Sequence, residues 1–324
     1  MKQLLKQIIS DIRSTKDLYN YISDYIYMRK HSLSNPNQSQ DRQLASIMLL
    51  MHALEKGMSF PSQRTFGEQK AIALTDQLIK YLNSKPRNTI CTIAINVLAE
   101  YMRCDHSTQN ETARAHIQKL LEQNQDIIQK NYAGSKEIQK LPNFNKQEIE
   151  TFYKSRSSIR SYSNEPVTDD EIKEAMKIAS TTPTACNRQA CRIHVYRDKG
   201  LIKKLINNQL GDQGWCHNAP ILFVITTNAS FFNNLYERYQ PLIDGGLYAM
   251  NFDMGLHLNH IGSCFKMFVR SPKKEKEFKK LAQIPENEIP IVLIFAGHYP
   301  KHSIKSPKSV RITDNNPLET VTIH

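Results

Sequence analysis

The sequence predicts an all-α region followed by an α+β domain. Three observations support this division: helical spacing of apolar residues over the first 130 residues, a polar stretch near residue 140, and apolar runs of strand length beyond it. At 324 residues the chain has the length of two ordinary domains. We therefore expect an all-helical domain over residues 1–132, a linker over 133–146 and a second domain over 147–324.

The N-terminal region repeats the helical period of 3.6 residues several times. Its first pattern, over residues 2–29, includes Leu4, Ile8, Leu18, Ile22 and Ile26 and fits one or two amphipathic helices. The next pattern begins at Leu44 and has Gly57 as its natural stop. Three more helical patterns follow, near residues 67–83, 88–104 and 110–131.

The chain between Gly134 and Asn145 has the composition of a linker and no apolar period. Beyond it, Thr168 followed by Glu171 has the spacing of a helix capping box, and a helix of about twelve residues is expected there. Strands alternating with helices are typical of an α/β or α+β domain. We expect three strands, around Ile193–Val195, Ile221–Thr226 and Ile289–Phe295, with a long helix over residues 242–261 before the last.

The charge distribution argues against a nucleic-acid binding surface. The net charge of +12 is divided evenly, with 20 basic and 14 acidic residues in 1–148 and 23 and 17 in the remainder. A dedicated nucleic-acid surface concentrates Lys and Arg on one face instead. The densest basic run, Lys273–Lys280, has the spacing of a solvated helix face.

Six cysteines show no paired metal-ligand spacing, so we expect reduced thiols and no metal site. The sequence contains no apolar run of membrane-spanning length and no signal-peptide pattern at its start. We therefore expect a soluble, cytoplasmic protein that does not insert into membranes.

The basic stretch Arg156-Ser157-Ser158-Ile159-Arg160 is the strongest candidate for a ligand site. Two guanidinium groups and two hydroxyls lie within five residues, and Arg forms strong charge-assisted hydrogen bonds with anionic oxygens. In an extended segment Arg156, Ser158 and Arg160 would point the same way, and Ile159 would turn inward. The alternative, an ordinary solvated basic surface, stays open on composition alone.

Segments further along the chain resemble, in order, those of the nitroreductase family of flavin enzymes. They are Glu165–Val167, Thr182–Gln189, Ile261–Cys264, Gly297–Pro300 and Pro307–Arg311, after the stretch 156–160. The resemblance covers roughly residues 147–324. It implies a nitroreductase-like, FMN-binding α-β-α sandwich, preceded here by the all-α domain.

The resemblance also implies a set of cofactor-binding residues. Arg156, Ser157, Ser158 and Arg160 match the family's first phosphate and ribityl contacts, and Lys308 and Arg311 its late basic pair. The family usually spaces that pair as Lys-x-Arg, so which of the two contacts the phosphate is left open. Pro183, Thr184, Ala185 and Asn187 match the loop that reaches the partner subunit's flavin. Ile261 to Cys264 would end the long helix, with Gly262 in a left-handed cap and the backbone N–H groups of Ser263 and Cys264 facing the flavin.

The implied function is that of an FMN-dependent oxidoreductase using NAD(P)H and a small-molecule substrate in a ping-pong cycle. No catalytic acid or base is implied, because the flavin supplies the chemistry. No Gly-x-Gly-x-x-Gly motif follows a strand, so a separate nicotinamide-binding Rossmann domain is not expected. Two alternatives stay open. One is a flavin-dependent dehydrogenase acting on a sugar or peptide intermediate, and the other is a degenerate binding module in surface-polysaccharide assembly.

Two further expectations concern assembly. The helix over residues 242–261 is apolar on more than one face, which is typical of an interface helix, so we expect a homodimer. The string His52-Ala53-Leu54-Glu55-Lys56-Gly57 resembles one in a nitroreductase subgroup associated with polysaccharide biosynthesis. A surface His–Glu pair on an ordinary helix is the alternative explanation of that string.

Overall fold

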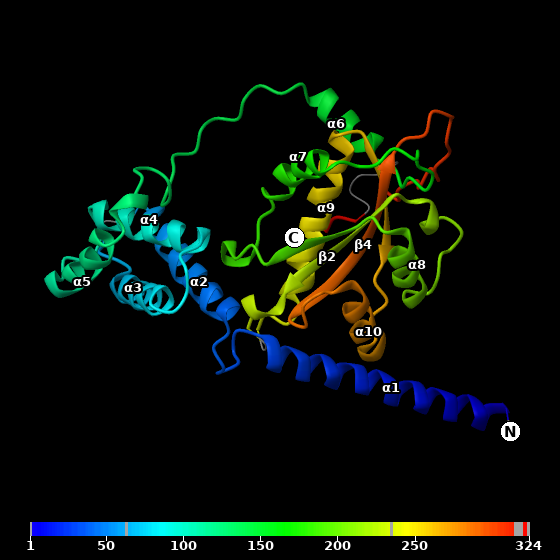
Figure 1. Cartoon of the computed structure of the whole chain (residues 1–324), viewed down its shortest axis with the longest axis horizontal. Coiled ribbons are helices and arrows are strands. Elements are labelled where there is room, and N and C mark those ends of the chain that lie inside the picture. Colours follow the sequence, from blue (N-terminus) through cyan, green and yellow to red (C-terminus); the bar gives the residue numbers. More distant parts are fainter. Residues whose placement is uncertain (1, 62–63, 234–235, 314–319, 323–324) are drawn as a thin grey trace.

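The computed structural model describes residues 2–61, 64–233, 236–313 and 320–322. Its N-terminal part is entirely helical (Figure 1). The helices are α1 (Lys2–His31), α2 (Gln40–Met58), α3 (Glu68–Leu82), α4 (Thr89–Arg103), α5 (Glu111–Glu122) and the short η1 (Gln125–Ile127). The predicted helical patterns are confirmed, with two changes. Gly57 lies inside the last turn of α2 rather than beyond it, and the pattern near 110–131 is α-helical only to Glu122.

Helices α2 to α5 pack around one apolar core, and side chains cap the N-termini of three of them. The side chains of Ser39, Asn88 and Asn110 accept hydrogen bonds from the first turns of α2, α4 and α5. Inside the core, the buried Asn96 amide donates to two backbone carbonyls and its oxygen accepts from the Gln129 amide. Apolar periodicity and capping therefore act together to specify this bundle.

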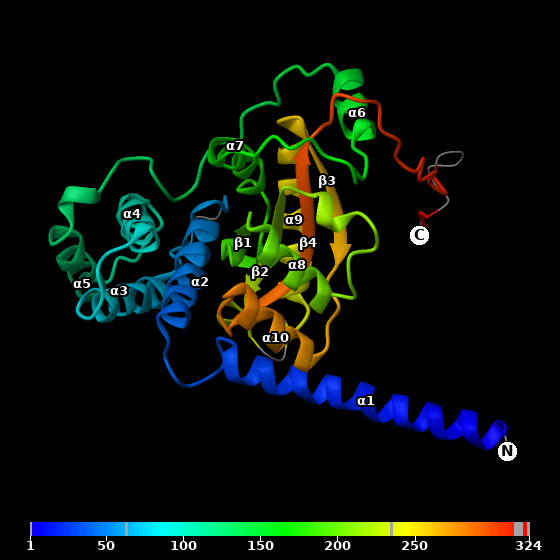
Figure 2. The same ribbon diagram turned by 45° about the vertical axis from the view of Figure 1, so that its right-hand side comes forward.

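Helix α1 lies apart from that bundle. Its C-terminal end packs on the sheet domain, where Met28 is buried with Ala229 and Ile289, and the rest of the helix extends away from the body of the molecule (Figure 2). The predicted apolar face at Leu18, Ile22 and Ile26 is consequently exposed. The side chains of Leu4 and Ile8 lie outside the described residues.

Residues 133–145 form neither helix nor strand, as a linker would. The helical and sheet parts nevertheless share a core, because Ala190, Phe231 and Phe232 are buried with the apolar residues of α2 to α5. The division into 1–132, 133–146 and 147–324 stays a prediction.

The sheet has four antiparallel strands in the order β1-β2-β4-β3. They are β1 (Cys191–Tyr196), β2 (Ile221–Asn228), β3 (Ile261–Met267) and β4 (Glu288–His298). The prediction of only three strands was wrong, since it took Ile261–Cys264 as the end of the preceding helix. Every residue of β2 is buried, which explains the continuous apolar run from Ile221 to Ile225 at its start.

Helices cover both faces of the sheet. On one face α7 (Asp169–Ala179) and α9 (Gln240–Leu258) pack over the odd-numbered side chains of β2 from Ile221 to Ile225. On the other face α8 (Lys199–Asn208) and α10 (Pro272–Ala282) pack over Leu222 and Val224. The predicted α-β-α sandwich with a helical N-terminal region is therefore confirmed (Figure 1).

Two local features determine where α7 begins and how closely it packs against α9. The capping box predicted at the start of α7 is present, with the Thr168 and Glu171 side chains each bonded to the other's backbone amide. Gly255 of α9 allows close packing, because a Cβ at this position would lie 2.4 Å from the Ala175 carbonyl oxygen of α7. Among the described residues, no helix is both long enough and apolar enough to cross a membrane.

Candidate functional site

The basic segment 156–160 runs alongside the edge strand β3, directly after α6 (Lys146–Ser155). Ser158 forms an isolated parallel bridge with Ser263, and the Ile159 amide donates to the Ser263 carbonyl at 2.8 Å. Ile159 is buried against Gly262, where an added Cβ would lie 2.9 Å from its side chain. Ile159 therefore turns inward as expected, and Arg160 is exposed.

Arg156 lies beside a buried carboxylate that sequence reasoning missed. Its Nη1 is 3.9 Å from Oδ2 of Asp253, a residue of α9 whose side chain is 1% exposed. The Ser263 hydroxyl donates to Asp253 Oδ1, whereas Oδ2 accepts no hydrogen bond from any described residue. Burial raises the pKa of Asp253, and the Ser263 hydrogen bond and Arg156 oppose that rise. The sequence feature that could have indicated Asp253 is its position, as an acidic residue between the apolar Phe252 and Met254 of a helix.

A distance of 3.9 Å allows attraction between Arg156 and Asp253 but is too long for a hydrogen bond. Within the described chain Arg156 makes no hydrogen bond, and its side chain is 22% exposed. Its N–H groups are therefore available to an anion. Asp253 provides a nearby negative charge that holds the guanidinium close to β3.

Two aromatic contacts flank this segment. The Arg160 guanidinium carbon lies 5.6 Å from the Trp215 ring centroid, in the range of a cation–π contact. On the other side, the His257 ring stacks on Phe152 with centroids 5.0 Å apart, and its Nε2 lies 2.8 Å from Ser155 Oγ. Burial lowers the pKa of His257, and the charge of Arg156 adds to this effect, which favours the neutral ring.

The C-terminal tail returns to the same place. The Ser306 hydroxyl donates to the Ser158 carbonyl at 3.1 Å, although the two residues are far apart in sequence. Lys308 and Arg311 follow on this tail and are exposed. The fold thus brings the tail that carries the predicted late basic pair to the predicted first basic segment.

The predicted cap at Gly262 is wrong. Helix α9 ends at Leu258, His260 adopts the left-handed conformation with φ 57°, and Gly262 to Cys264 lie inside β3. Ser263 and Cys264 pair with Ala296 and Phe295 of β4 and are buried. The pairing of β3 with β4 on one side, and the bond from the Ile159 amide to the Ser263 carbonyl on the other, place these residues in a strand instead of a helix cap. The three residues still lie next to segment 156–160.

The loop with Pro183, Thr184, Ala185 and Asn187 lies elsewhere. The Ala185 amide, at the start of η2 (Ala185–Asn187), donates to the buried Asp244 Oδ2 at 3.1 Å. Asp244 precedes Asp253 by nine residues on α9, which corresponds to about 13 Å along the helix axis. Within one chain, therefore, the loop and the basic segment lie beside different parts of α9: the loop at Asp244 and the basic segment at Asp253.

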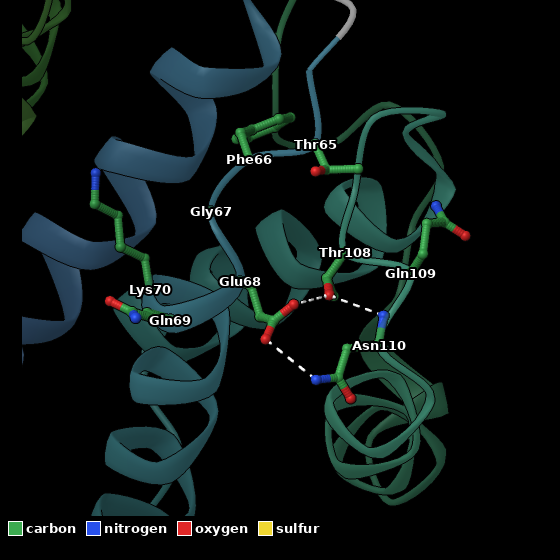
Figure 3. A pocket seen from close by; sticks show the side chains of 9 residues that line it. All are labelled: Thr65, Phe66, Gly67, Glu68, Gln69, Lys70, Thr108, Gln109 and Asn110. Carbon is green, nitrogen blue, oxygen red and sulfur yellow. Dashed lines mark hydrogen bonds between the residues drawn. The ribbon is translucent and has the colours of Figure 1, made fainter.

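Neither of two surface pockets includes a predicted site residue. One, of about 490 Å³, is lined by residues 65–70 and 108–110 between the starts of α3 and α5 (Figure 3). There the Glu68 carboxylate accepts hydrogen bonds from the Thr108 hydroxyl and the Asn110 side chain. The other, of about 530 Å³, is lined by residues of α6 and Asn145. The candidate site lies instead at the edge of the sheet, along β3.

Comparison with solved structures gives partial similarities. An FMN-dependent nitroreductase from Clostridium difficile is 20% identical and aligns over 53% of this chain and 96% of its own, with a TM-score of 0.44. A nitroreductase family protein from Clostridium novyi is 17% identical over 47% of this chain and 85% of its own, with a TM-score of 0.42.

Curated relatives are similar in sequence over nearly half of the chain. A protein of Archaeoglobus fulgidus, named as an NADH dehydrogenase/NAD(P)H nitroreductase, is 26% identical over 45% of this chain and 82% of its own. The FMN reductase [NAD(P)H] of Bacillus subtilis is 26% identical over 47% of this chain and 66% of its own. Residues 153–212 match the family model described as the nitroreductase family. The segment 153–212 is therefore similar to the nitroreductase family.

Proposed function

We propose that the chain is an FMN-dependent oxidoreductase that transfers hydride from NAD(P)H to a small-molecule substrate. The observation that carries the proposal is the family match over residues 153–212, which includes both the basic segment 156–160 and the loop 183–187. The names of the two curated relatives, an NAD(P)H nitroreductase and an FMN reductase, support the same chemistry.

The residues at the sheet edge fit the phosphate of FMN. That phosphate carries a charge of about −1.5 to −2 and accepts several strong hydrogen bonds. Arg156 has unused donors, Ser157 and Ser158 follow it directly in the chain, and the tail with Lys308 and Arg311 joins the segment at Ser158. The partly unsatisfied Asp253 carboxylate limits the excess positive charge.

When bound, FMN supplies the chemistry by accepting hydride from NAD(P)H and passing it to a second substrate in a ping-pong cycle. The chain's own residues bind and orient the cofactor. Arg156, Arg160 and the tail cations would hold the phosphate, and the contact with Trp215 limits the directions that Arg160 can take. No side chain is required as a catalytic acid or base.

We also propose that the active form is a homodimer built on α9. Five large apolar residues of this helix are exposed although its other residues pack on α7 and the sheet: Leu242, Ile243, Leu247, Met250 and Leu258. Apolar area of this kind on one helix favours burial against another chain. The loop 183–187, placed about 13 Å from its own basic segment along α9, would then contact the flavin of the partner.

Titration of the purified chain with FMN and with riboflavin tests the proposal. We expect FMN to bind with quenching of its fluorescence, and riboflavin to bind more weakly because it lacks the phosphate. Turnover of NADH or NADPH by the FMN-loaded chain then tests the reaction. Absence of FMN binding would refute the proposed function.

The link to polysaccharide biosynthesis rests on residues 52–58 alone. In the structure His52 Nδ1 lies 3.6 Å from Glu55 Oε2 on α2, and both side chains are partly exposed. A surface ion pair accounts for this contact. The finer assignment therefore stays a prediction, to be tested by capture of polysaccharide-assembly partners with the full chain.

A further inference from the structure

The loop that follows Pro183 adopts an unusual backbone conformation. Cys186, Asn187 and Gln189 all have left-handed torsions, with φ of 52°, 52° and 50°. Each non-glycine residue in this region costs roughly 1–2 kcal/mol. Three such residues within four positions keep their conformation only if the surroundings hold the loop in place.

Arg188 provides one of these constraints. Its side chain is 0% exposed, and its Nε donates to the Ala185 carbonyl of the loop at 2.9 Å. Nη1 donates to the Phe231 carbonyl at 2.6 Å, and the two Nη groups each donate to a Glu237 oxygen at 2.8 Å. Arg188 thus joins the loop to η4 (Ala229–Phe231) and to the start of α9.

The helical N-terminal region in turn holds η4. The Leu33 amide, before α2, donates to the Phe232 carbonyl at 2.8 Å. Asp41 in the first turn of α2 accepts from the Asn228 and Asn287 side-chain amides at 2.9 and 2.8 Å. Phe231 and Phe232 are buried within the core of α2 to α5, and α2 is the bundle helix that lies next to the sheet domain (Figure 2).

We propose that the helical N-terminal region braces the loop 183–189, with Asp41 and Arg188 as its positioning residues. The connection runs from α2 through Asn228 to η4 and then through Arg188 to the Ala185 carbonyl. The inference rests on the proposed function in one respect: the braced loop is the one expected to contact flavin. The bracing residues of the N-terminal region, Asp41 among them, lie outside the family match over residues 153–212. The matched segment alone therefore does not contain the brace.

Hydrogen exchange of the flavin-free chain measures the brace directly. Four loop amides have identified acceptors: Ala185 with Asp244 Oδ2, Asn187 with the Thr184 carbonyl, Arg188 with the Ala185 carbonyl and Gln189 with Thr184 Oγ1. We expect Asp41→Ala to speed their exchange about tenfold, because two hydrogen bonds that fix η4 are lost. Asp41→Asn keeps an acceptor oxygen and should restore wild-type exchange.

Two further variants sharpen the test. Glu237→Gln, which weakens the paired contact with Arg188, should also speed exchange of the loop amides. His116→Ala removes a surface pair with Asp76, at 2.8 Å, between α3 and α5 and away from the loop. This control should leave the loop amides unchanged. Amides of β2 serve as an internal reference, since global destabilisation would speed their exchange as well.

Titration with FMN adds a second readout that separates the two proposals. We expect Asp41→Ala to weaken FMN binding about threefold or more, and Asp41→Asn to restore it. Loop exchange unchanged in Asp41→Ala, or equally fast in β2, would overturn the brace even if FMN binds normally. Failure of the wild-type chain to bind FMN would overturn the proposed function, and the exchange experiment would still decide the brace.

Discussion

The bundle α2–α5 and the sheet domain differ in how completely each covers its own apolar surface. Of the described large apolar residues that are exposed, none lies in α2 to α5, whereas five lie on α9 alone. The bundle is complete within one chain. The sheet domain has an exposed apolar face on α9, a partly exposed basic segment at 156–160 and an exposed basic tail. Exposed apolar and basic surfaces of this kind are typical of sites that bind partners or ligands.

A charged substitution on the exposed apolar face of α9 should have the largest effect, because this face is the proposed dimer interface. Met250 is 44% exposed, and Met250→Asp would bury a carboxylate in the proposed dimer interface. The expected cost is about 3 kcal/mol or more, so the dimer should weaken about 100-fold or more. Sedimentation measures the dimer, and flavin content of the same sample shows whether the two properties are linked.

Leu141→Asp is the matched control, because Leu141 is an exposed apolar residue in the segment before α6. It should leave the sedimentation of the chain unchanged. A Met250→Asp variant that stays dimeric would show that α9 is not the interface. Monomers with full flavin content would instead show that one chain is sufficient for the site.

The basic segment provides the second test. Arg156→Ala should weaken FMN binding about 10- to 150-fold, since a hydrogen bond to a charged group contributes roughly 1.5–3 kcal/mol. The free energy of unfolding should change little, because Arg156 makes no hydrogen bond within the described chain. Fluorescence titration measures the affinity, and unchanged binding would place the phosphate elsewhere. Combined with Arg160→Ala, the losses should be non-additive, because both residues would bind one ligand.

Helix capping offers a smaller test within the sheet domain. Thr168→Ala removes the hydroxyl that accepts from the Glu171 amide and leaves that amide without its cap. The expected loss of unfolding free energy is about 1 kcal/mol. Urea denaturation measures it, and Thr168→Ser is the control that keeps the cap. An equal loss in the serine variant would mean that the hydroxyl contributes nothing.

Acidification tests the attachment of α1, which differs from the bundle in its exposed apolar face. Burial, with help from Lys30 and Lys279, lowers the pKa of His31 to about 4 from an ordinary value of 6.5. Between these two values the unfolded chain binds the proton more readily than the folded chain. Stability should therefore fall as the pH decreases from about 6.5 towards 4.

Because His31 is only half-buried, we expect this to be the smallest of the four effects. Thermal unfolding at pH 7 and pH 5 measures it. In His31→Gln the difference between the two pH values should be smaller than in the wild type. A wild type and variant with the same pH dependence would show that other groups cause it.

Several features could be predicted because they depend on neighbouring residues. The helices α2 to α5 follow from apolar spacing, and the start of α7 follows from Thr168 and Glu171. The inward turn of Ile159 follows from alternation in an extended segment. In each case the interactions that specify the element lie within a few residues of one another along the chain.

Other features depended on contacts between distant segments. Strand β3 exists because Ile261–Met267 pairs with β4, and no local pattern separated these residues from the end of α9. The pairing of Asp253 with Arg156 joins residues that are nearly a hundred positions apart. Arg188 was one residue of a recognised motif, and only the fold shows it joining the loop to η4.

The sequence by itself therefore determined the helical bundle, the α+β class of the second half and the residue types suited to an anionic cofactor. The tertiary structure decided which segments meet: the tail contacts Ser158, and the loop packs against α2. It also left one apolar face of α9 exposed among the described residues. The physical reason is that local hydrogen bonding and apolar periodicity act over a few residues. Strand pairing, burial and charge pairing act between segments that only the folded chain brings together.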